Sequence, residues 1–344
     1  MNTIFSFAIG TGKQNKKGQW LEVFYPEPQL GVSEDVIEIV KEILWYDGGN
    51  EALSATNEQI RILCERLDRI NEHQLAQQAR LLSDSKDHLV VTVLATDEPP
   101  ISTPEAYLKL HLLSHRLVKP HTIQLQGIFP LLPNVAWTNQ GAIDLEELPE
   151  KQLQSRLAGE LLTIFSIDKF PQMTNYVVPK GVRIGNTARV RLGAFIGEGT
   201  TVMHEGFVNF NAGTEGTAMI EGRISAGVFV GEGTDLGGGC STMGTLSGGN
   251  DTIISLGAGC LIGANAGVGI PLGDRCTIEA GLYITAGSIV EVIDNNGEVT
   301  GKIKARDLSG KSDLLFRRHS LSGSIQVLTN QSAIELNHEL HQHN

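Results

Sequence analysis

Aliphatic residues recur at every sixth position through the middle of the chain. They form four runs, at Val178, Ile184, Val190, Ile196, Val202, Val208; Ile224, Val230, Leu236; Leu256, Ile262, Val268; and Leu272, Ile278, Ile284, Val290. An α-helix repeats its face every 3.6 residues and a strand every two, so neither explains a period of six. This period is typical of a parallel β-helix, in which short strands direct one side chain each into a stacked interior and three strands complete a coil. The spacing predicts such a coil over residues 178–290.

Two stretches interrupt the repeat, residues 209–223 and 237–255. Insertions into a solenoid usually form loops on one side, where function is commonly found. Glycines at corners, such as Gly231 and Gly263, permit tight turns without a Cβ clash. The alternative, a series of Gly-rich hairpins, would be punctuated at irregular spacing. We therefore expect a coil with two inserted loops.

Residues 1–120 are predicted to form a small α/β unit. Strands are expected over residues 20–25 and 88–95, where short apolar stretches occur. The third helix is expected to run to about Val118. Signals for a helix N-terminus occur three times, at Ser33, at Thr56 with Gln59 as a capping box, and at Thr103 with Pro104.

Residues 121–177 are predicted to connect this unit to the coil, with a strand at 135–137 and a helix over 149–165. Residues 291–344 are predicted to form a C-terminal β segment with a polar tail. The segment begins with an Asn-Gly hairpin and continues with strands at 314–316 and 324–328. The tail histidines are expected to lie in solvent rather than bind metal; they are His338, His341 and His343.

Composition narrows the class of protein. The chain has 344 residues, of which 41% are hydrophobic, and no apolar run approaches the roughly 18 residues of a membrane span. Its first residues lack the pattern of a signal peptide, so a cytoplasmic location is expected. Four cysteines form no CxxC pair, and we expect them to be reduced packing residues; they are Cys64, Cys240, Cys260 and Cys276.

Charge argues for a small anionic ligand rather than nucleic acid. The net charge is −12, which disfavours nucleic acid as a general partner. Residues 302–320 carry the opposite charge, because they contain six basic and only two acidic residues. Such a segment attracts small multiply charged anions, although a merely solvated basic face would have the same composition.

The chemistry of the coil is limited by its few histidines. A zinc carbonic anhydrase on this architecture needs a cluster of histidines, yet His204 is the single histidine between residues 178 and 290. His204 could act as a general base in acyl transfer, but a lone histidine is more often structural. Glu221 stands two residues before Arg223, and could serve as a base or as a nucleophile that carries the acyl group. A simple ion pair between Glu221 and Arg223 is the alternative.

Longer motifs resemble one family, the tetrahydrodipicolinate N-succinyltransferases of bacterial lysine and diaminopimelate synthesis, and especially its longer branch from actinobacteria and pseudomonads. The resemblance covers residues 180–330. It rests on MHEGFVNFNAGTEGTAMIEGRISAGVFVGEGTDLGGGCSTMGTLSGGN, LIGANAGVGIPLGD, IEAGLYITAG, KARDLSG and LLFRRHSLSG. For the coil it implies a left-handed parallel β-helix, which would follow the α/β N-terminal domain, and it implies a homotrimer with active sites between neighbouring subunits.

The resemblance also implies a reaction and its residues. Succinyl would pass from succinyl-CoA to the amine of ring-opened tetrahydrodipicolinate, with Glu221 as the catalytic carboxylate. Glu205 would lie at the threefold axis, where three copies can hold Mg²⁺. Further positions would contact succinyl-CoA, some along its channel and the basic ones at its phosphates: Arg223, Gly238, Ser241, Ala264, Glu279, Ala280, Gly287, Lys304, Arg317, Arg318, His319 and Ser320.

Two other functions fit the same residues. One is an acetyl-CoA-dependent transferase acting on the same amine or on a sugar nucleotide. The other is a catalytically silent assembly protein whose coil only builds a trimer. Whether Glu221 would act as a nucleophile or as a general base is left open by the sequence.

Overall fold

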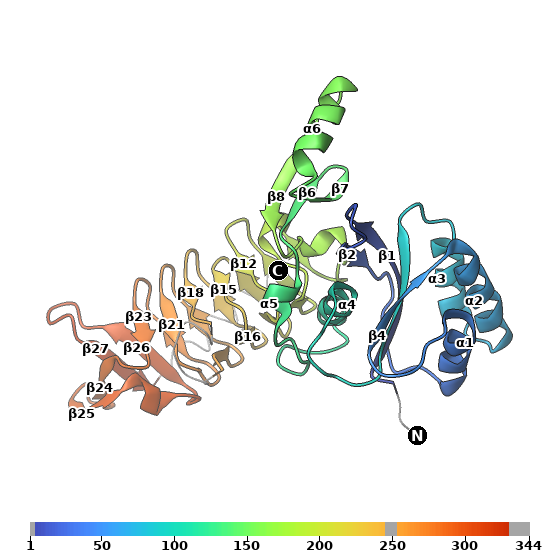
Figure 1. The fold of residues 1–344 in the computed structure, drawn as a ribbon. Helices are drawn as coiled ribbons and strands as arrows, with labels where there is room; N and C mark the ends of the chain where they lie inside the picture. The colour runs from blue at the N-terminus through green and yellow to red at the C-terminus, as the bar shows by residue number, and fades with distance from the viewer. Residues whose placement is uncertain (1–3, 245–252, 330–344) are drawn as a thin grey trace. The chain divides into compact units, whose positions relative to one another are not determined.

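The computed structural model describes residues 4–244 and 253–329 (Figure 1). The chain divides into two compact units. The first comprises residues 1–118, 122–171 and 175–177, and the second comprises 119–121, 172–174 and 178–344. Within the described ranges, every helix is too short or too polar to cross a bilayer.

The first unit is built on an antiparallel sheet in the order β2-β1-β5-β4, with β3 also paired to β1. A buried apolar cluster joins Phe7 and Ile9 on one face of the sheet to helices α1–α3. Helix α4 contacts β2, β4 and β5 instead, and Tyr25, directly after β2, donates a hydrogen bond to the Pro104 carbonyl. The elements are β1 (Ser6–Gln14), β2 (Trp20–Phe24), β3 (Gln29–Leu30), α1 (Glu34–Leu44), β4 (Glu51–Ala55), α2 (Asn57–Arg69), α3 (His73–Leu82), β5 (His88–Leu94) and α4 (Thr103–Ser114).

The predicted helix starts are confirmed, with one shift. The Ser33 hydroxyl accepts from the Val36 amide at the start of α1, and α2 has the full capping box of Thr56 and Gln59. Helix α4 begins at Thr103, but Ser102 is its N-cap. It ends at Ser114 rather than Val118, because Arg116 adopts a φ of 62°, outside helical backbone.

A second, three-stranded sheet completes the first unit in the order β7-β6-β8. The elements of this part of the chain are α5 (Ile128–Leu131), β6 (Val135–Thr138), β7 (Gly141–Asp144), α6 (Leu148–Leu157) and β8 (Ile164–Asp168). The strand at 135–137 is confirmed. The helix predicted over 149–165 is wrong beyond Leu157, because Gly159 takes a φ of 76° and residues 164–168 pair with β6.

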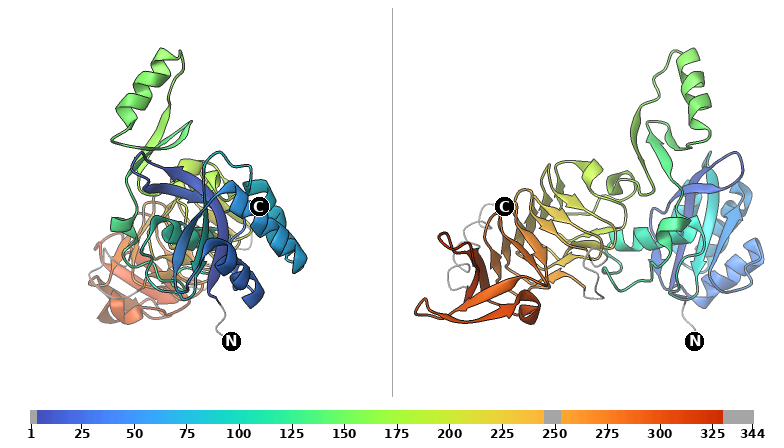
Figure 2. Two further views of the ribbon diagram at one scale, coloured as in Figure 1. Left: turned by 45° about the vertical axis from the view of Figure 1, so that its right-hand side comes forward. Right: turned by 60° about the vertical axis from the view of Figure 1, so that its left-hand side comes forward.

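The second unit is the predicted coil, a left-handed parallel β-helix (Figures 1 and 2). Its parallel sheets follow the orders β10-β13-β16-β19, β12-β15-β18-β21-β23 and β9-β11-β14-β17-β20-β22. The strands are β9 (Arg183–Ile184), β10 (Ala194–Ile196), β11 (Thr200–Val202), β12 (Phe207–Val208), β13 (Ala212–Thr214), β14 (Ala218–Ile220), β15 (Arg223–Ile224), β16 (Phe229–Val230), β17 (Asp235–Leu236), β18 (Ser241–Thr242), β19 (Ser255–Leu256), β20 (Leu261–Ile262), β21 (Gly267–Gly269), β22 (Thr277–Ile278) and β23 (Tyr283–Thr285). Short 3₁₀ turns are η1 (Met173–Asn175), η2 (Thr187–Arg189) and η3 (Ala305–Leu308).

The six-residue positions from Val190 onward form the interior of the coil. Ile184 pairs with Val202, which pairs with Ile220, and the stack continues through aligned residues of successive coils. From Val190 onward, the predicted interior positions are at most 3% exposed. Val178 is 73% exposed, so its predicted interior place is wrong. It precedes β9, the first strand of its sheet, and therefore has no coil to stack upon.

The first predicted inserted loop is also wrong. Residues 212–214, 218–220 and 223–224 are strands β13, β14 and β15, with Thr214 and Ile220 buried in the stack. The coil is continuous there, and only the corner between Ile220 and Ile224 is two residues shorter than the usual six. In the second stretch β18 continues the coil, and residues 245–252 lie outside the described part.

The C-terminal elements extend the longest sheet. Strands β24 (Ile289–Ile293) and β25 (Val299–Lys304) form the predicted hairpin, and β26 (Leu314–Arg318) pairs parallel to β22 and antiparallel to β27 (Ile325–Thr329). The tail histidines at 338, 341 and 343 lie outside the described residues.

Candidate functional site

One edge of the coil carries most of the predicted site residues. In the longest sheet, the residue that follows each interior residue donates a backbone hydrogen bond. The acceptor is the carbonyl of the interior residue in the next coil. These bonds run from Glu221 to Leu236, Gly237 to Ile262, Gly263 to Ile278 and Glu279 to Phe316, at 2.8, 2.8, 2.8 and 2.9 Å. Since paired strands lie about 4.8 Å apart, Glu221, Gly237, Gly263, Glu279 and Arg317 form a column along this edge.

Glu221 lies at the shortened corner of that edge. Its coil leaves only Glu221 and Gly222 between β14 and β15. A Cβ on Gly222 would lie 2.3 Å from Cys240 Sγ, and one on Gly238 would lie 3.5 Å from Glu221 Oε2. Glycine at 222 therefore lets the next coil pack directly on this corner. Glycine at 238 leaves the space beside the half-buried Glu221 carboxylate free of a side chain.

The Arg223 side chain contacts Ser241 on the outer face of the sheet. Its Nε lies 3.4 Å from Ser241 Oγ, and the two residues are paired in register between β15 and β18. Within the described part of the chain, Arg223 forms no ion pair with Glu221, so the simple pairing considered from the sequence is absent from the structure. A carboxylate without a cation partner remains able to accept a proton or to attack a carbonyl.

The same outer face carries a residue that sequence reasoning missed. Arg223, Ser241, Gly267 and Tyr283 follow one another through paired strands. A Cβ on Gly267 would lie 2.1 Å from Tyr283 Cδ1, so the phenol ring lies directly over this glycine. Tyr283 is 46% exposed. The six-residue register aligns Gly267 with Tyr283, and that alignment was the available signal.

Cys240 is packed beneath the Glu221 corner. Burial raises the pKa of its thiol to about 12, with the Arg223 charge opposing and the Glu221 charge adding to that rise. The thiol is therefore protonated near neutrality and acts as a packing group. All four cysteines are buried and unpaired, as predicted.

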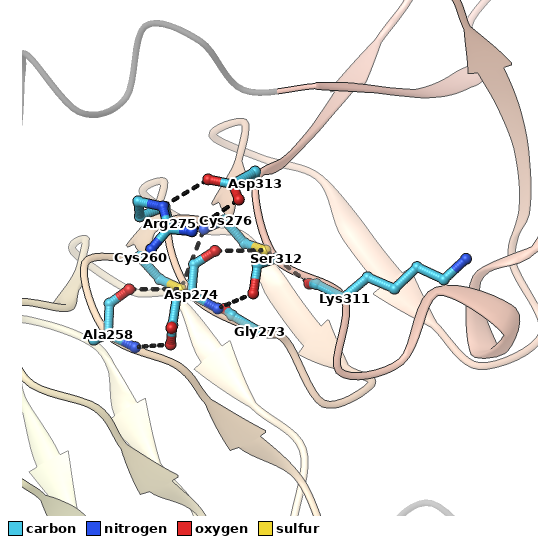
Figure 3. Close-up of polar contacts among 9 residues, drawn as sticks. All are labelled: Ala258, Cys260, Gly273, Asp274, Arg275, Cys276, Lys311, Ser312 and Asp313. Atoms are coloured by element: carbon cyan, nitrogen blue, oxygen red, sulfur yellow. Dashed lines mark hydrogen bonds and ion pairs between the residues drawn. The ribbon is translucent and has the colours of Figure 1, made fainter.

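A different edge of the coil is held by structural polar contacts (Figure 3). The Arg275 guanidinium forms two hydrogen bonds with the Asp313 carboxylate, at 2.6 and 2.8 Å. The thiols of Cys260 and Cys276 donate to the carbonyls of Gly273 and Lys311, at 3.1 and 3.2 Å. These contacts fasten the segment before β26 to the coil below it, and so fix the strand that carries Arg317 and Arg318.

Farther along the Glu221 edge, small residues pack closely and Glu279 contacts the backbone of Arg318. The Gly281 amide donates to the Ala264 carbonyl at 2.8 Å, and a Cβ on Gly263 would lie 2.4 Å from the Ala280 nitrogen. Glu279 Oε2 accepts from the Arg318 amide at 2.6 Å. Backbone packing is thus too close here for larger side chains.

The remaining predicted residues lie in the C-terminal elements. Lys304 ends β25 opposite Ile289, and the Ala305 amide donates to the Ser288 carbonyl, next to Gly287. His319 and Ser320 follow β26 in the turn to β27. There His319 Nδ1 contacts Ser322 Oγ at 2.9 Å.

Glu205 and His204 occupy the corner one coil before Glu221, and both are exposed. Arg189 donates to the backbone carbonyls of Glu205 and Gly206, at 2.8 and 3.0 Å, and not to the carboxylate. The described residues contain no group of three side chains from this single chain that could hold a metal ion. A metal at Glu205 would therefore need carboxylates from further copies.

Comparison with known proteins gives a consistent picture. Models of the N-terminal and middle domains of tetrahydrodipicolinate N-succinyltransferase match residues 6–130 and 132–172, and a hexapeptide repeat of succinyl-transferase matches 253–286. The chain is 65% identical to the 2,3,4,5-tetrahydropyridine-2,6-dicarboxylate N-succinyltransferase of Pseudomonas putida, covering 100% of this chain and 99% of the relative.

More distant relatives carry related names. The Vibrio cholerae enzyme of the same name is 54% identical over 99% of both chains. A Campylobacter jejuni crystal structure, of a protein proposed to be a 2,3,4,5-tetrahydropyridine-2-carboxylate N-succinyltransferase, superposes with a TM-score of 0.89 at 32% identity. It covers 97% of this chain and 94% of that one.

Proposed function

The chain belongs to the tetrahydrodipicolinate N-succinyltransferase family, and we propose that Glu221 is its catalytic carboxylate. As an acyltransferase, it moves succinyl from succinyl-CoA to the amine of ring-opened tetrahydrodipicolinate, the succinylase step of diaminopimelate and lysine biosynthesis. One observation supports the role of Glu221 above the others. Its carboxylate lies at the shortened corner, with a glycine opposite and no ion pair to the neighbouring Arg223 among the described contacts.

Acyl transfer to an amine requires that a proton leave the nitrogen. The amine attacks the thioester carbonyl, the C–N bond forms, the C–S bond breaks, and CoA leaves as the thiol. Glu221 can accept the amine proton as a general base. Alternatively its carboxylate attacks first, forms a mixed anhydride, releases CoA, and then passes succinyl to the amine. The geometry of Glu221 is compatible with both routes.

The edge beyond Glu221 suits an extended acyl-CoA. Gly238, Ala264 and Ala280 are small, so a slender chain can approach the backbone, and Ser241 offers a hydroxyl on the adjoining face. Glu279 is held by the Arg318 amide. Fixed cations beyond it suit the phosphates of CoA. We assign the phosphate contacts to the cations of Lys304, Arg317 and Arg318 and to the side chains of His319 and Ser320, with Gly287 leaving room beside them.

We further propose that the active unit is a homotrimer. The column around Glu221 is the edge of one coil, and a second copy would supply the opposite wall of a substrate site. Glu205 presents an exposed carboxylate that makes no hydrogen bond or ion pair among the described contacts. Three such carboxylates on an axis form the hard oxygen donor set that Mg²⁺ accepts, and the ion would offset their mutual repulsion.

The decisive assay follows release of CoA thiol from succinyl-CoA and from acetyl-CoA, each with and without tetrahydrodipicolinate. We expect release that depends on the acceptor and on succinyl-CoA. Glu221→Gln should lower it by roughly 10²–10⁴-fold, the usual contribution of a positioned acid or base. Glu232→Gln, which changes an exposed glutamate elsewhere on the coil, should leave the rate unchanged. Sedimentation of both variants should show the same oligomer as the wild type.

Each alternative predicts a different result. Faster turnover with acetyl-CoA would indicate the acetyltransferase. No release from either donor, with an intact trimer, would indicate an assembly protein. Full activity in Glu221→Gln would remove Glu221 from catalysis. If the acceptor is omitted, a succinyl adduct on the intact protein would favour the nucleophile, and an unmodified mass after rapid quenching would favour the base.

A further inference from the structure

The first unit contains a cavity of about 410 Å³ that no step of the acyl transfer uses. It lies where the ends of β1 and β4 meet the start of α2 and the turn between α3 and β5. Its size falls within the range of small-molecule sites, about 300–1,000 Å³. Unlike most such sites, its walls are mainly polar. The polar residues used below are Ser54, Asn57, Ser85, Lys86, Asp87 and His88.

The walls of this cavity are fixed by hydrogen bonds. The Asn57 amide donates to the carbonyls of Ser83 and Ser85, at 2.8 and 3.0 Å. The Ser85 hydroxyl bonds the Thr11 hydroxyl at 2.7 Å and accepts from the Asp87 amide at 3.1 Å. The turn that carries the charged residues is therefore positioned before any ligand arrives, which lowers the entropic cost of binding.

The cavity has an excess of unused donors. Asp87 is already paired with the Lys13 ammonium at 2.5 Å, so this carboxylate already has a cation partner. Among the described contacts, the side chains of Ser54, Lys86 and His88 form no hydrogen bond or ion pair. An ammonium, a hydroxyl and an imidazole thus line one polar space, and the carboxylate beside them is already paired with Lys13. This arrangement favours a ligand that brings negative charge and several acceptor oxygens.

We propose that this cavity binds a small oxyanion, a phosphate or carboxylate group. The Lys86 ammonium provides the charge, the Ser54 hydroxyl donates a hydrogen bond, and the His88 ring lies beside the bound group as a further donor. Asp87 stays with Lys13 and does not contact the ligand. The site belongs to the first unit and does not depend on the role of Glu221.

Trp20 provides a local reporter. Its ring centroid lies 6.1 Å from that of His88, at an interplanar angle of 81°. A ligand that contacts His88 should therefore change the emission of Trp20. The probes are inorganic phosphate and malonate, titrated at constant ionic strength with chloride as the replacement. The part of the signal lost in Trp20→Phe is the part that reports this cavity.

We expect a saturable change with one or both probes, and the probe that saturates identifies the anion class. Lys86→Gln should weaken it about tenfold or more, since a charge-assisted hydrogen bond is lost. Lys151→Gln, which changes an exposed lysine on α6, should bind like the wild type. If Lys86→Gln is poorly folded by circular dichroism, Ser54→Ala serves in its place. A linear response with both probes, equal affinity in Lys86→Gln, or a signal that survives Trp20→Phe would overturn the proposal.

Discussion

Glu22 should make the stability of the first unit depend on pH. This glutamate on β2 accepts hydrogen bonds from the Lys13 amide at 3.0 Å and from the Tyr176 hydroxyl at 3.1 Å. Burial raises the pKa of the Glu22 carboxyl from its ordinary value of 4.5 to about 7. The two hydrogen bonds oppose that rise, and the nearby Asp87 charge adds to it. The carboxyl is therefore protonated in the folded state at pH values where the unfolded chain would release the proton.

The sign and size of the effect follow from this difference. Below pH 4.5 the Glu22 carboxyl is protonated in both the folded and the unfolded state, so it does not make stability depend on pH there. Between pH 4.5 and 7 the unfolded state releases its proton first, so stability falls as pH rises. A pKa difference of about 2.5 corresponds to about 3 kcal/mol, at 1.36 kcal/mol for each pH unit. Glu22 is only half-buried as a residue, so about 3 kcal/mol is an upper value.

Glu22→Gln removes the titration and retains a group that can accept from the Lys13 amide. We expect the variant to gain up to about 2–3 kcal/mol over the wild type between pH 5 and pH 8. Urea unfolding followed by tryptophan fluorescence measures this, because all three tryptophans lie in the first unit. Glu27→Gln, at an exposed glutamate, is the control. A Glu22→Gln advantage that does not change with pH, or that shrinks as pH rises, would refute the reasoning.

Three further outcomes test other parts of the structure. Asp97→Asn should cost about 3 kcal/mol or more in urea unfolding, because it leaves the fully buried Lys109 ammonium without its ion pair; a change below 1 kcal/mol would count against that contact. Gly222→Ala should lower thiol release strongly, because its Cβ would lie 2.3 Å from Cys240 Sγ, while Gly301→Ala, which meets nothing within 4 Å, should not. Iodoacetamide at pH 8 should leave Cys240 unmodified by mass spectrometry until the protein is unfolded, since burial raises the pKa of this thiol to about 12; rapid alkylation of the native protein would show that the thiol is accessible.

Local signals in the sequence predicted the elements that carry them, and the missed elements lack such signals. Thr56 and Gln59 predicted the start of α2, because a capping box is formed by residues close together in the chain. Strand β1 was missed because its first five residues are all buried, which removes the alternation of a half-buried strand. The helix predicted over 149–165 ran too far because the pairing of residues 164–168 with β6 depends on a distant part of the chain.

The candidate site divides in the same way. Spacing placed the coil, and the motif around Glu221 suggested the carboxylate. Neither revealed that Glu221, Gly238, Ala264 and Glu279 share one edge, because that depends on the register of successive coils. Counting only aliphatic residues also passed over Thr214, a buried stacked residue, and so made a continuous coil look like an inserted loop.

The observed register shows that the corner with Glu221 is shorter than its neighbours on the same edge. On this edge the corners before and after it keep the full six-residue step, from Val202 to Val208 and from Leu236 to Thr242. The step from Ile220 to Ile224 is two residues shorter, so its backbone must take a more direct path between the two sheets. Gly222 permits that path, because any side chain there would meet Cys240. On this edge the shortened step, which the interior stack tolerates, has thus altered the outer surface at a single coil, and the residue at that point is the proposed catalytic carboxylate.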